Sequence, residues 1–157
     1  MKLIPLTQGK FAIVDDEDYD ELAPHRWHYH KSGGYGARIV GPRKSAKTIL
    51  MHRQILEVPH GMHTDHKNGD GLDNRRCNLR VCRQSENAKN RKLNYSNTSG
   101  AKGVRFDTVR KLWESRIRSD KIDYYLGWYN TKEEAVVAYD VASRFLHGEF
   151  ARPNVVR

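Results

Sequence analysis

The sequence predicts an α+β protein that is built from small modules and has no single large core. Only 38% of its 157 residues are hydrophobic and the mean hydropathy is −0.83, which is too polar for one extensive interior. Short alternating apolar stretches between turn residues predict several short strands. We therefore expect a β-rich N-terminal scaffold, a central ββα unit and a C-terminal three-stranded antiparallel sheet packed on one helix.

Residues 1–50 form the predicted scaffold. Apolar residues alternate loosely along 3–14, and Gln8–Gly9 in that stretch indicates the turn of a hairpin. The acidic run 15–18 favours the first turn of a short helix, where negative charge interacts well with the helix dipole. Aromatic and β-branched residues in 27–40 indicate further strands.

A central unit over residues 51–92 follows the order strand, loop, strand, helix. The segments 62–66 and 78–83 predict the two strands, and the polar stretch 67–76 joins them. Ser85 is a suitable N-cap for the helix that comes next. This arrangement gathers most of the chemically active side chains of the chain.

That unit contains the groups that phosphodiester hydrolysis requires. The reaction needs an activated water, a cation that stabilises the charged phosphate, and groups that orient both. Asp65 places a carboxylate beside the imidazole of His66, and a neutral imidazole can accept a proton from water at physiological pH. Alone, such a pair is more often part of a surface turn than of a site.

The combination of motifs resembles the HNH endonuclease family, particularly the homing endonucleases of phages and introns. The motifs are Asp65-His66, Asn78-Leu79-Arg80, Ser85-Glu86-Asn87 and the loop 68–76. The resemblance implies that His66 is the general base, that Asp65 and Asn87 bind one divalent cation, and that Asn78 braces the loop that orients His66.

The predicted ligands also indicate which metal would bind. Asp65 and Asn87 offer only oxygen atoms, which suit Mg²⁺ or Mn²⁺ better than zinc. Asn87 stands where many members of the family have a histidine, so the metal preference is open between these two ions. The family also implies products with a 5′-phosphate and a 3′-hydroxyl.

Residues 93–101 are predicted to be a linker, because 94–100 is small, polar and without periodicity. The C-terminal module, 102–154, begins with strand patterns at three places. These are 103–106, 112–118 and 124–129.

A helix over 132–147 completes this module. Thr131 and Glu134 form a capping box at its start, and Gly148 suits a left-handed cap at its end. One helix face is expected to pack on the sheet. Its residues are Ala135, Ala138, Tyr139, Ala142, Phe145 and Leu146.

Residues 99–154 resemble the Apetala/ethylene-response-factor DNA-binding domain. The matching motifs are Gly103-Val104-Arg105, Trp113 with Arg116-Ile117-Arg118, Leu126-Gly127-Trp128-Tyr129, Thr131-Lys132-Glu133-Glu134-Ala135, Ala138-Tyr139-Asp140 and the segment 148–154. In that family the sheet, and not the helix, enters the major groove.

Strand alternation agrees with that orientation. It places Val104 and Phe106 on the helix side, together with Trp113, Ser115 and Ile117, and we expect Trp113 to belong to the core. It leaves Arg105, Glu114, Arg116 and Arg118 for the opposite side.

Positive charge is concentrated in the part of the chain where the two family resemblances predict DNA contacts. The formal net charge is +9, and residues 75–118 hold 13 Lys and Arg against 3 Asp and Glu, whereas residues 1–74 hold 10 of each. Double-stranded DNA is therefore the expected partner. The predicted contacts are Arg76, Arg80, Arg83, Lys89, Arg91, Lys102, Arg105, Lys111, Arg116, Arg118 and Tyr125.

Composition and motifs also argue against other classes. No apolar run approaches the roughly 20 residues of a membrane-spanning helix, and the N-terminus lacks the apolar stretch of a signal peptide, so we expect a protein of the bacterial or phage-infected cytoplasm. Cys77 and Cys82 match neither a zinc knuckle nor a disulfide framework.

Two other functions stay open from the sequence. A DNA-binding regulator could retain the ββα unit without catalysis, although the intact Asp65, His66 and Asn87 argue against this. RNA binding or cleavage fits the charge but lacks identifiable aromatic platforms. One site cuts one strand, and the sequence does not distinguish a monomer from a dimer.

Overall fold

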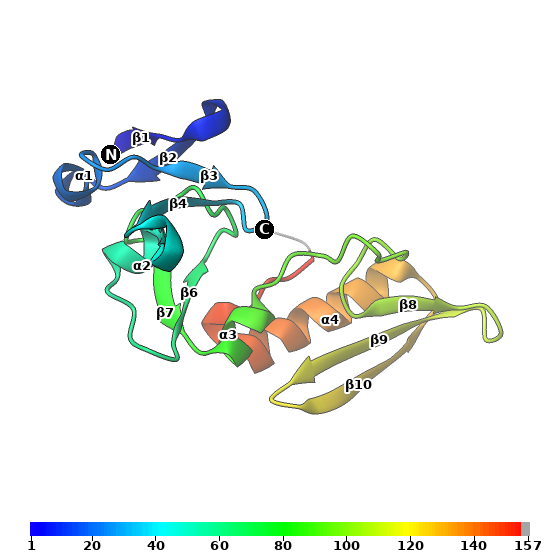
Figure 1. Cartoon of the computed structure of the whole chain (residues 1–157). Coiled ribbons are helices and arrows are strands. Elements are labelled where there is room, and N and C mark those ends of the chain that lie inside the picture. The colour runs from blue at the N-terminus through cyan, green and yellow to red at the C-terminus, as the bar shows by residue number, and fades with distance from the viewer. Residues whose placement is uncertain (155–157) are drawn as a thin grey trace. The chain divides into compact units, whose positions relative to one another are not determined.

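The computed structural model describes residues 1–154 and has a mixed α and β architecture with several small antiparallel sheets (Figure 1). This confirms the predicted fold class. The chain divides into two compact units, a first unit Met1–Gln84 and a second unit that begins at Ser85. Each unit has its own hydrophobic core.

The first unit starts with the predicted hairpin. Strand β1 (Lys2–Pro5) pairs antiparallel with β2 (Phe11–Val14). Both Gln8 and Gly9, in the turn, have φ of 64°, a conformation that glycine adopts at no steric cost. Helix α1 (Asp16–Leu22) follows, with three acidic residues in its first turn.

A three-stranded sheet and a short helix continue this unit. The sheet has the order β3-β4-β5, with β3 at His28–His30, β4 at Tyr35–Val40 and β5 at Lys47–Leu50. Helix α2 (Met51–Ile55) begins directly after β5.

The ββα segment follows. Strand β6 (His63–His66) pairs antiparallel with β7 (Leu79–Cys82). Helix α3 (Gln84–Lys89) begins one residue before Ser85, so Ser85 lies inside the helix and the expectation that it caps the helix is wrong. Only Arg83 separates the end of β7 at Cys82 from the start of α3 at Gln84.

One hydrophobic core joins the scaffold and the β6–β7 hairpin. Leu79 of β7 lies in the same buried cluster as the N-terminal hairpin, α1 and α2. The cluster consists of Ile4, Leu6, Ala12, Val14, Leu22, Trp27, Met51, Ile55 and Leu79. The scaffold therefore holds the hairpin directly, through shared burial of apolar surface.

The second unit contains the predicted sheet and helix. Strands β8 (Val104–Asp107), β9 (Leu112–Ser119) and β10 (Ile122–Tyr129) form an antiparallel sheet with β9 in the centre. Helix α4 (Lys132–His147) has the capping box of Thr131 and Glu134. Across residues 1–154 no helix combines the length and apolar character that crossing a membrane would require.

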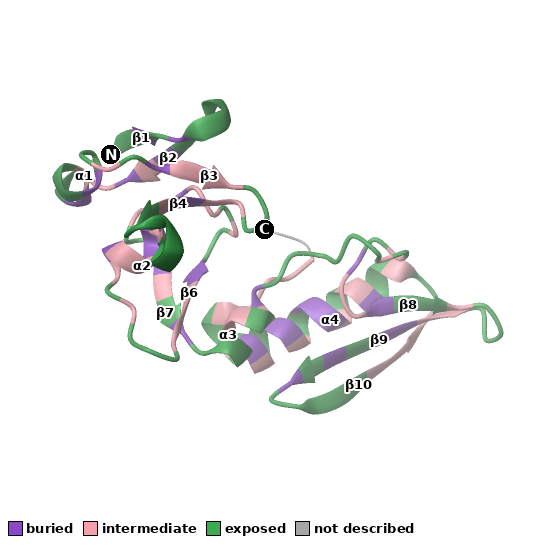
Figure 2. Cartoon of the chain, viewed as in Figure 1, coloured by how far each residue is buried: buried purple, intermediate pink, exposed green. Residues whose placement is uncertain are grey.

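Helix α4 packs on one face of this sheet, and buried segments alternate with exposed ones along both α4 and β9 (Figure 2). The buried core between helix and sheet includes Val104, Ile117, Ala135 and Tyr139, and Trp113 packs against it as expected. Short 3-10 helices complete the chain at Thr7–Gly9, Arg43–Ser45 and Gly148–Phe150.

Two aromatic residues do not take the positions that the sequence predicted. Phe145 is 87% exposed, because six residues after the buried Tyr139 it lies roughly 120° around the helix axis. Phe106 is 43% exposed and does not pack under α4. Its ring lies against that of Trp113, with 5.1 Å between the ring centroids.

Candidate functional site

The β6–β7 hairpin carries the predicted metal ligand Asp65 and the predicted general base His66 at its loop end. Asp65 lies opposite Arg80 and His66 opposite Leu79 in the strand register. Asp65 and His66 are each only 5% exposed. The hairpin therefore carries a carboxylate and an imidazole at consecutive positions of β6, and both side chains are largely dehydrated.

Asn78 organises the loop that joins β6 to β7. Its side-chain amide donates to the carbonyl of Asp73 at 2.7 Å and to Oδ1 of Asn68 at 3.1 Å. Its side-chain oxygen accepts from the backbone N–H of Asn68 at 3.0 Å. Its carbonyl accepts from the N–H of Lys67, the residue after His66. These bonds fix the loop next to the imidazole.

The N-terminal scaffold clamps the same loop. The backbone N–H of Ile13 donates to the carbonyl of Leu72, and the N–H of Asn74 donates to the carbonyl of Ile13, both at 2.8 Å. Gly71 approaches the β3–β4 turn so closely that a Cβ there would lie 2.5 Å from the carbonyl of Gly34 and from the ring of Tyr35. A side chain at position 71 would therefore displace the loop.

Three side chains surround the His66 ring. Nε2 of His66 lies 3.3 Å from Oδ1 of Asn74. The Tyr35 ring stacks on it, with 5.6 Å between centroids and 16° between planes, and the His52 ring meets it edge-on at 5.0 Å. None of these three was predicted as a site residue, although Asn74 lies in the loop 68–76 of the predicted motif. Tyr35 and His52 lie within apolar stretches typical of a scaffold, and only contacts across elements reveal them.

Burial controls the protonation of both histidines. It lowers the pKa of His66 below its ordinary value, against the raising effects of Asn74 and Asp65. Burial, with smaller contributions from the charges of His66 and Arg53, lowers the pKa of His52 to about 3. Nδ1 of His52 is buried without a hydrogen-bond partner among the described residues. Both rings are therefore neutral at physiological pH.

Asp65 forms an ion pair with Arg80 across the hairpin. Nε and Nη2 of Arg80 donate to Oδ2 of Asp65 at 2.8 and 2.6 Å, and the side chains are only 10% and 6% exposed. The structure thus places Arg80 against the predicted metal ligand. A phosphate contact through Arg80 stays a prediction.

The described residues contain no group of three or more His, Cys, Asp or Glu side chains placed to hold a metal ion. A cation at Asp65 would need amide, water or phosphate oxygens to complete its shell, and Mg²⁺ accepts such a set because it keeps several waters. Asn87 lies on α3 in the second unit, and its role as a ligand stays a prediction.

The predicted DNA contacts differ in their surroundings. Arg76 pairs with Asp18 at 2.6 Å, and its backbone N–H donates to Asp15 at 2.7 Å, so it ties the loop to α1. Arg83 and Arg91 are exposed.

In the second unit Lys89 pairs with Asp120. Lys102 is half-buried, and burial, followed by the charge of Arg152, lowers its pKa to about 8.

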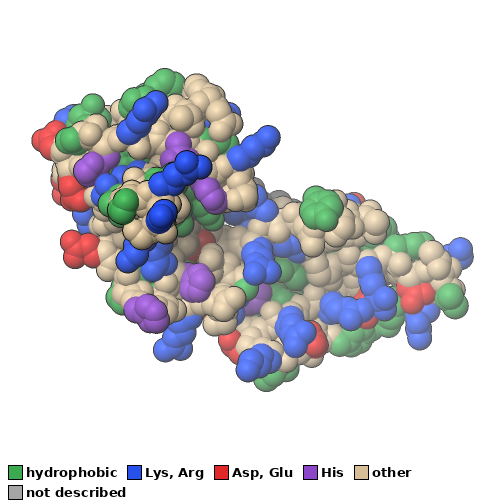
Figure 3. Space-filling model, viewed as in Figure 1, with side chains coloured by type: hydrophobic (Ala, Val, Ile, Leu, Met, Phe, Trp, Pro, Cys, Tyr) green, Lys and Arg blue, Asp and Glu red, His purple; other side chains and the backbone are tan. Residues whose placement is uncertain are grey.

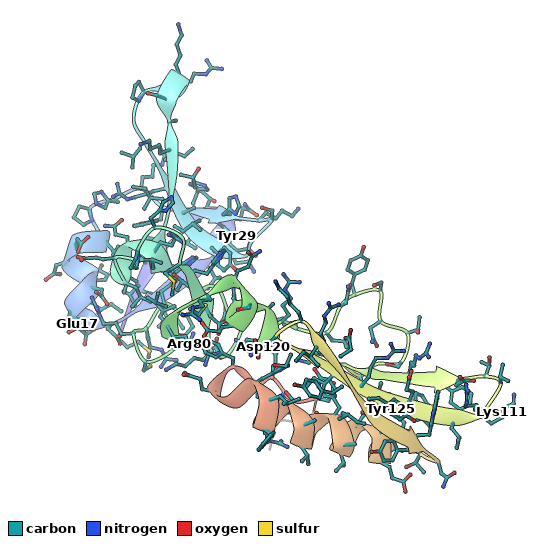
Figure 4. All side chains as sticks on the ribbon, turned by 90° about the horizontal axis from the view of Figure 1, so that it is seen from below. Glu17, Tyr29, Arg80, Lys111, Asp120 and Tyr125 are labelled. Carbon is teal, nitrogen blue, oxygen red and sulfur yellow. The ribbon has the colours of Figure 1, made fainter. Side chains whose placement is uncertain are left out.

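The sheet of the second unit carries the other predicted contacts. Arg105, Arg116 and Arg118 are exposed, as is Tyr125 on β10, and Lys111 lies in the turn between β8 and β9 (Figure 4). Lys and Arg side chains are frequent on the face shown in Figure 3. These positions suit contacts with a polyanion.

Comparison with known proteins identifies relatives of this chain. A family model described as HNH endonuclease matches residues 57–89, which include β6, β7 and α3. The chain is 26% identical over 151 residues to "Uncharacterized HNH endonuclease L560" of Acanthamoeba polyphaga mimivirus, covering 95% of this chain and 77% of the relative. It is 33% identical over 119 residues to "Protein 3.8" of Escherichia phage T7, covering 70% of this chain and 98% of the relative.

Proposed function

Since this chain belongs to the HNH endonuclease family, we propose that it is a metal-dependent DNA endonuclease that hydrolyses phosphodiester bonds with His66 as general base. The observation that carries the proposal is the neutral, nearly buried His66 beside Asp65 at the end of a clamped hairpin. The proposal includes a homing type of endonuclease, as the motifs in the sequence imply.

His66 has the surroundings of a proton acceptor. In the tautomer whose Nε2–H donates to Asn74, Nδ1 carries no proton and can accept one from water. The rings of Tyr35 and His52 restrict the rotation of the imidazole. Asn78 and the backbone hydrogen bonds of Ile13 on β2 keep the loop in place, so the base is oriented before substrate binds.

Asp65 would hold the divalent cation, Mg²⁺ or Mn²⁺, with Asn87 as the further ligand that the sequence predicts. The cation supplies positive charge that stabilises the phosphate and the leaving oxygen. Arg80 compensates the charge of the Asp65 carboxylate inside the hairpin. The expected products carry a 5′-phosphate and a 3′-hydroxyl.

The second unit would bind the double-stranded DNA. Its three-stranded sheet packed on one helix, with exposed arginines on the side away from α4, supports an Apetala-like DNA-binding module. Arginine is the side chain that pairs bidentately with guanine in the major groove.

Nicking of supercoiled plasmid in the presence of Mg²⁺ or Mn²⁺ tests this function. We expect His66→Ala to reduce the nicking rate by at least about 100-fold and to leave DNA affinity nearly unchanged, because the base acts on water. His60→Ala is the matched control, since His60 is exposed. A wild-type protein that binds DNA but does not nick with either metal would instead be a non-catalytic regulator.

A further inference from the structure

The outer face of the second unit's sheet contains a buried carboxylate, that of Glu114, among cations and aromatic rings. In the strand register Glu114 lies opposite Arg105 on β8 and opposite Trp128 on β10. Arg116, two residues further along β9, lies opposite Tyr125. Directly opposed residues and residues two apart share a face of a sheet, so all five side chains belong to one surface.

Glu114 is the buried member of this group. Its side chain is 10% exposed, whereas those of Arg105 and Arg116 are 60% and 50% exposed. Both arginines bind the same oxygen, Oε2 of Glu114, Arg105 through Nε and Arg116 through Nη2 at 2.9 Å. One carboxylate below the surface thus holds two guanidinium groups at the surface.

Glu114 is negatively charged at physiological pH. Burial acts to raise its pKa, but hydrogen bonds and charge from Arg105 and Arg116 outweigh burial and hold the pKa below its usual value. A negative charge on a DNA-facing surface weakens the general attraction for phosphate. Its benefit to DNA binding therefore cannot be general affinity.

We propose that Glu114 is a positioning residue for sequence recognition: it holds Arg105 and Arg116 in fixed orientations, which lets the sheet discriminate between DNA sequences at the expense of general affinity. The proposal rests on the DNA-binding role of this sheet. Arg105 uses Nε for the carboxylate, which leaves its two terminal nitrogens for a base edge. An arginine that is already ordered loses less rotamer entropy when it binds guanine.

The test compares specific with general binding. A preferred duplex is first selected from a randomised library with the wild-type protein. Dissociation constants are then measured for that duplex and for a scrambled duplex, using Glu114→Gln and the control Glu133→Gln, which removes the same charge from an exposed position on α4. We expect Glu114→Gln to bind the selected duplex about 10-fold more weakly, and the scrambled duplex equally or more tightly.

The outcomes separate this inference from the proposed function. If the wild type selects a sequence and Glu114→Gln discriminates equally well, Glu114 does not position the arginines and only this inference fails. Equal losses on both duplexes, with a lower melting temperature, would show a purely structural role and also overturn it. If the wild type selects no sequence, recognition by the sheet fails as well.

A second variant keeps the test informative should Glu114→Gln fold poorly. Arg105→Lys keeps the positive charge but cannot form the same fork with Oε2 and a base. We expect it to reduce discrimination between the two duplexes and to leave binding of the scrambled duplex unchanged. Unaltered discrimination by Arg105→Lys would contradict the proposal.

Discussion

At the scale of single residues, burial sets the chemistry of the candidate site. His66 has a carboxylate neighbour in Asp65, which favours the charged imidazolium, yet dehydration by the surrounding loop has the larger effect and lowers its pKa. A base of this kind is already unprotonated when the pH is slightly acidic. This has a direct consequence for the pH dependence of cleavage.

If His66 is the general base, as proposed, the nicking rate should rise with pH through a pKa below the ordinary histidine value of 6.5 and then stay level, because the base would act in its neutral form. Single-turnover nicking from about pH 5 to pH 8 would measure this. A rate that continues to rise above pH 7 would show that another group limits the reaction.

At the scale of secondary-structure elements, ion pairs and close packing hold the site together. Arg80 joins β7 to β6 through Asp65, and both side chains are nearly buried. Removing one partner of such a pair leaves an uncompensated charge inside the protein.

Arg80→Met should lower the free energy of unfolding by about 3 kcal/mol, because Asp65 loses its partner. Urea unfolding measures the change, and Arg43→Met is the control, since Arg43 is exposed and is not among the predicted DNA contacts. If Arg80 served only as a phosphate contact, stability would stay the same and the salt dependence of DNA binding would decrease instead.

Gly103, which precedes β8, lies at a point of close packing in the second unit. Its φ is +67°, and a Cβ there would lie 2.2 Å from the Tyr139 ring and 2.3 Å from the carbonyl of Arg116. The chain can pass between α4 and β9 at this point only without a side chain.

Gly103→Ala should destabilise the second unit by about 2 kcal/mol or more, because backbone strain adds to the clash. Gly148→Ala is a matched control: its φ is also positive, at +54°, but nothing lies within 4 Å of the new Cβ. Thermal unfolding of both variants measures the difference, and equal losses would mean that backbone strain alone matters.

At the scale of the whole molecule, several buried histidines make stability depend on pH. The pKa of His52, His66 and His147 is lowered in each case chiefly by burial. Below pH 6.5 the unfolded chain binds protons that the folded protein does not, so stability decreases as the pH falls. For His52 this decrease continues to about pH 3, where the folded ring also becomes protonated.

His52→Phe removes the largest of these effects. Between pH 7 and pH 5 the wild type should lose roughly 2 kcal/mol more stability than this variant, because only the wild type pays for keeping His52 neutral. Urea unfolding at both pH values measures the difference, with His60→Phe as the control at an exposed position. Equal losses in wild type and variant would mean that His52 is not held neutral by the fold.

The sequence by itself indicated the main elements and the pair proposed as the centre of the candidate site. The hairpin at Gln8–Gly9 and the helix 132–147 follow from turn residues, capping residues and apolar periodicity, which are local properties. The Asp65-His66 motif on a strand before a polar loop is also local, and the family relationship agrees with it.

Only the tertiary structure decided what surrounds those residues. Tyr35 and His52 contact His66, and Arg80 pairs with Asp65, through contacts between segments whose sequence patterns are independent of one another. Strand alternation placed Glu114 on the same face as Arg105 and Arg116, but only the structure shows that it is buried. Burial is a property of the packed chain, and it lowers the pKa of His52 and of His66 by removing water from their rings. No local pattern contains that information, because neighbouring segments in space are distant along the chain.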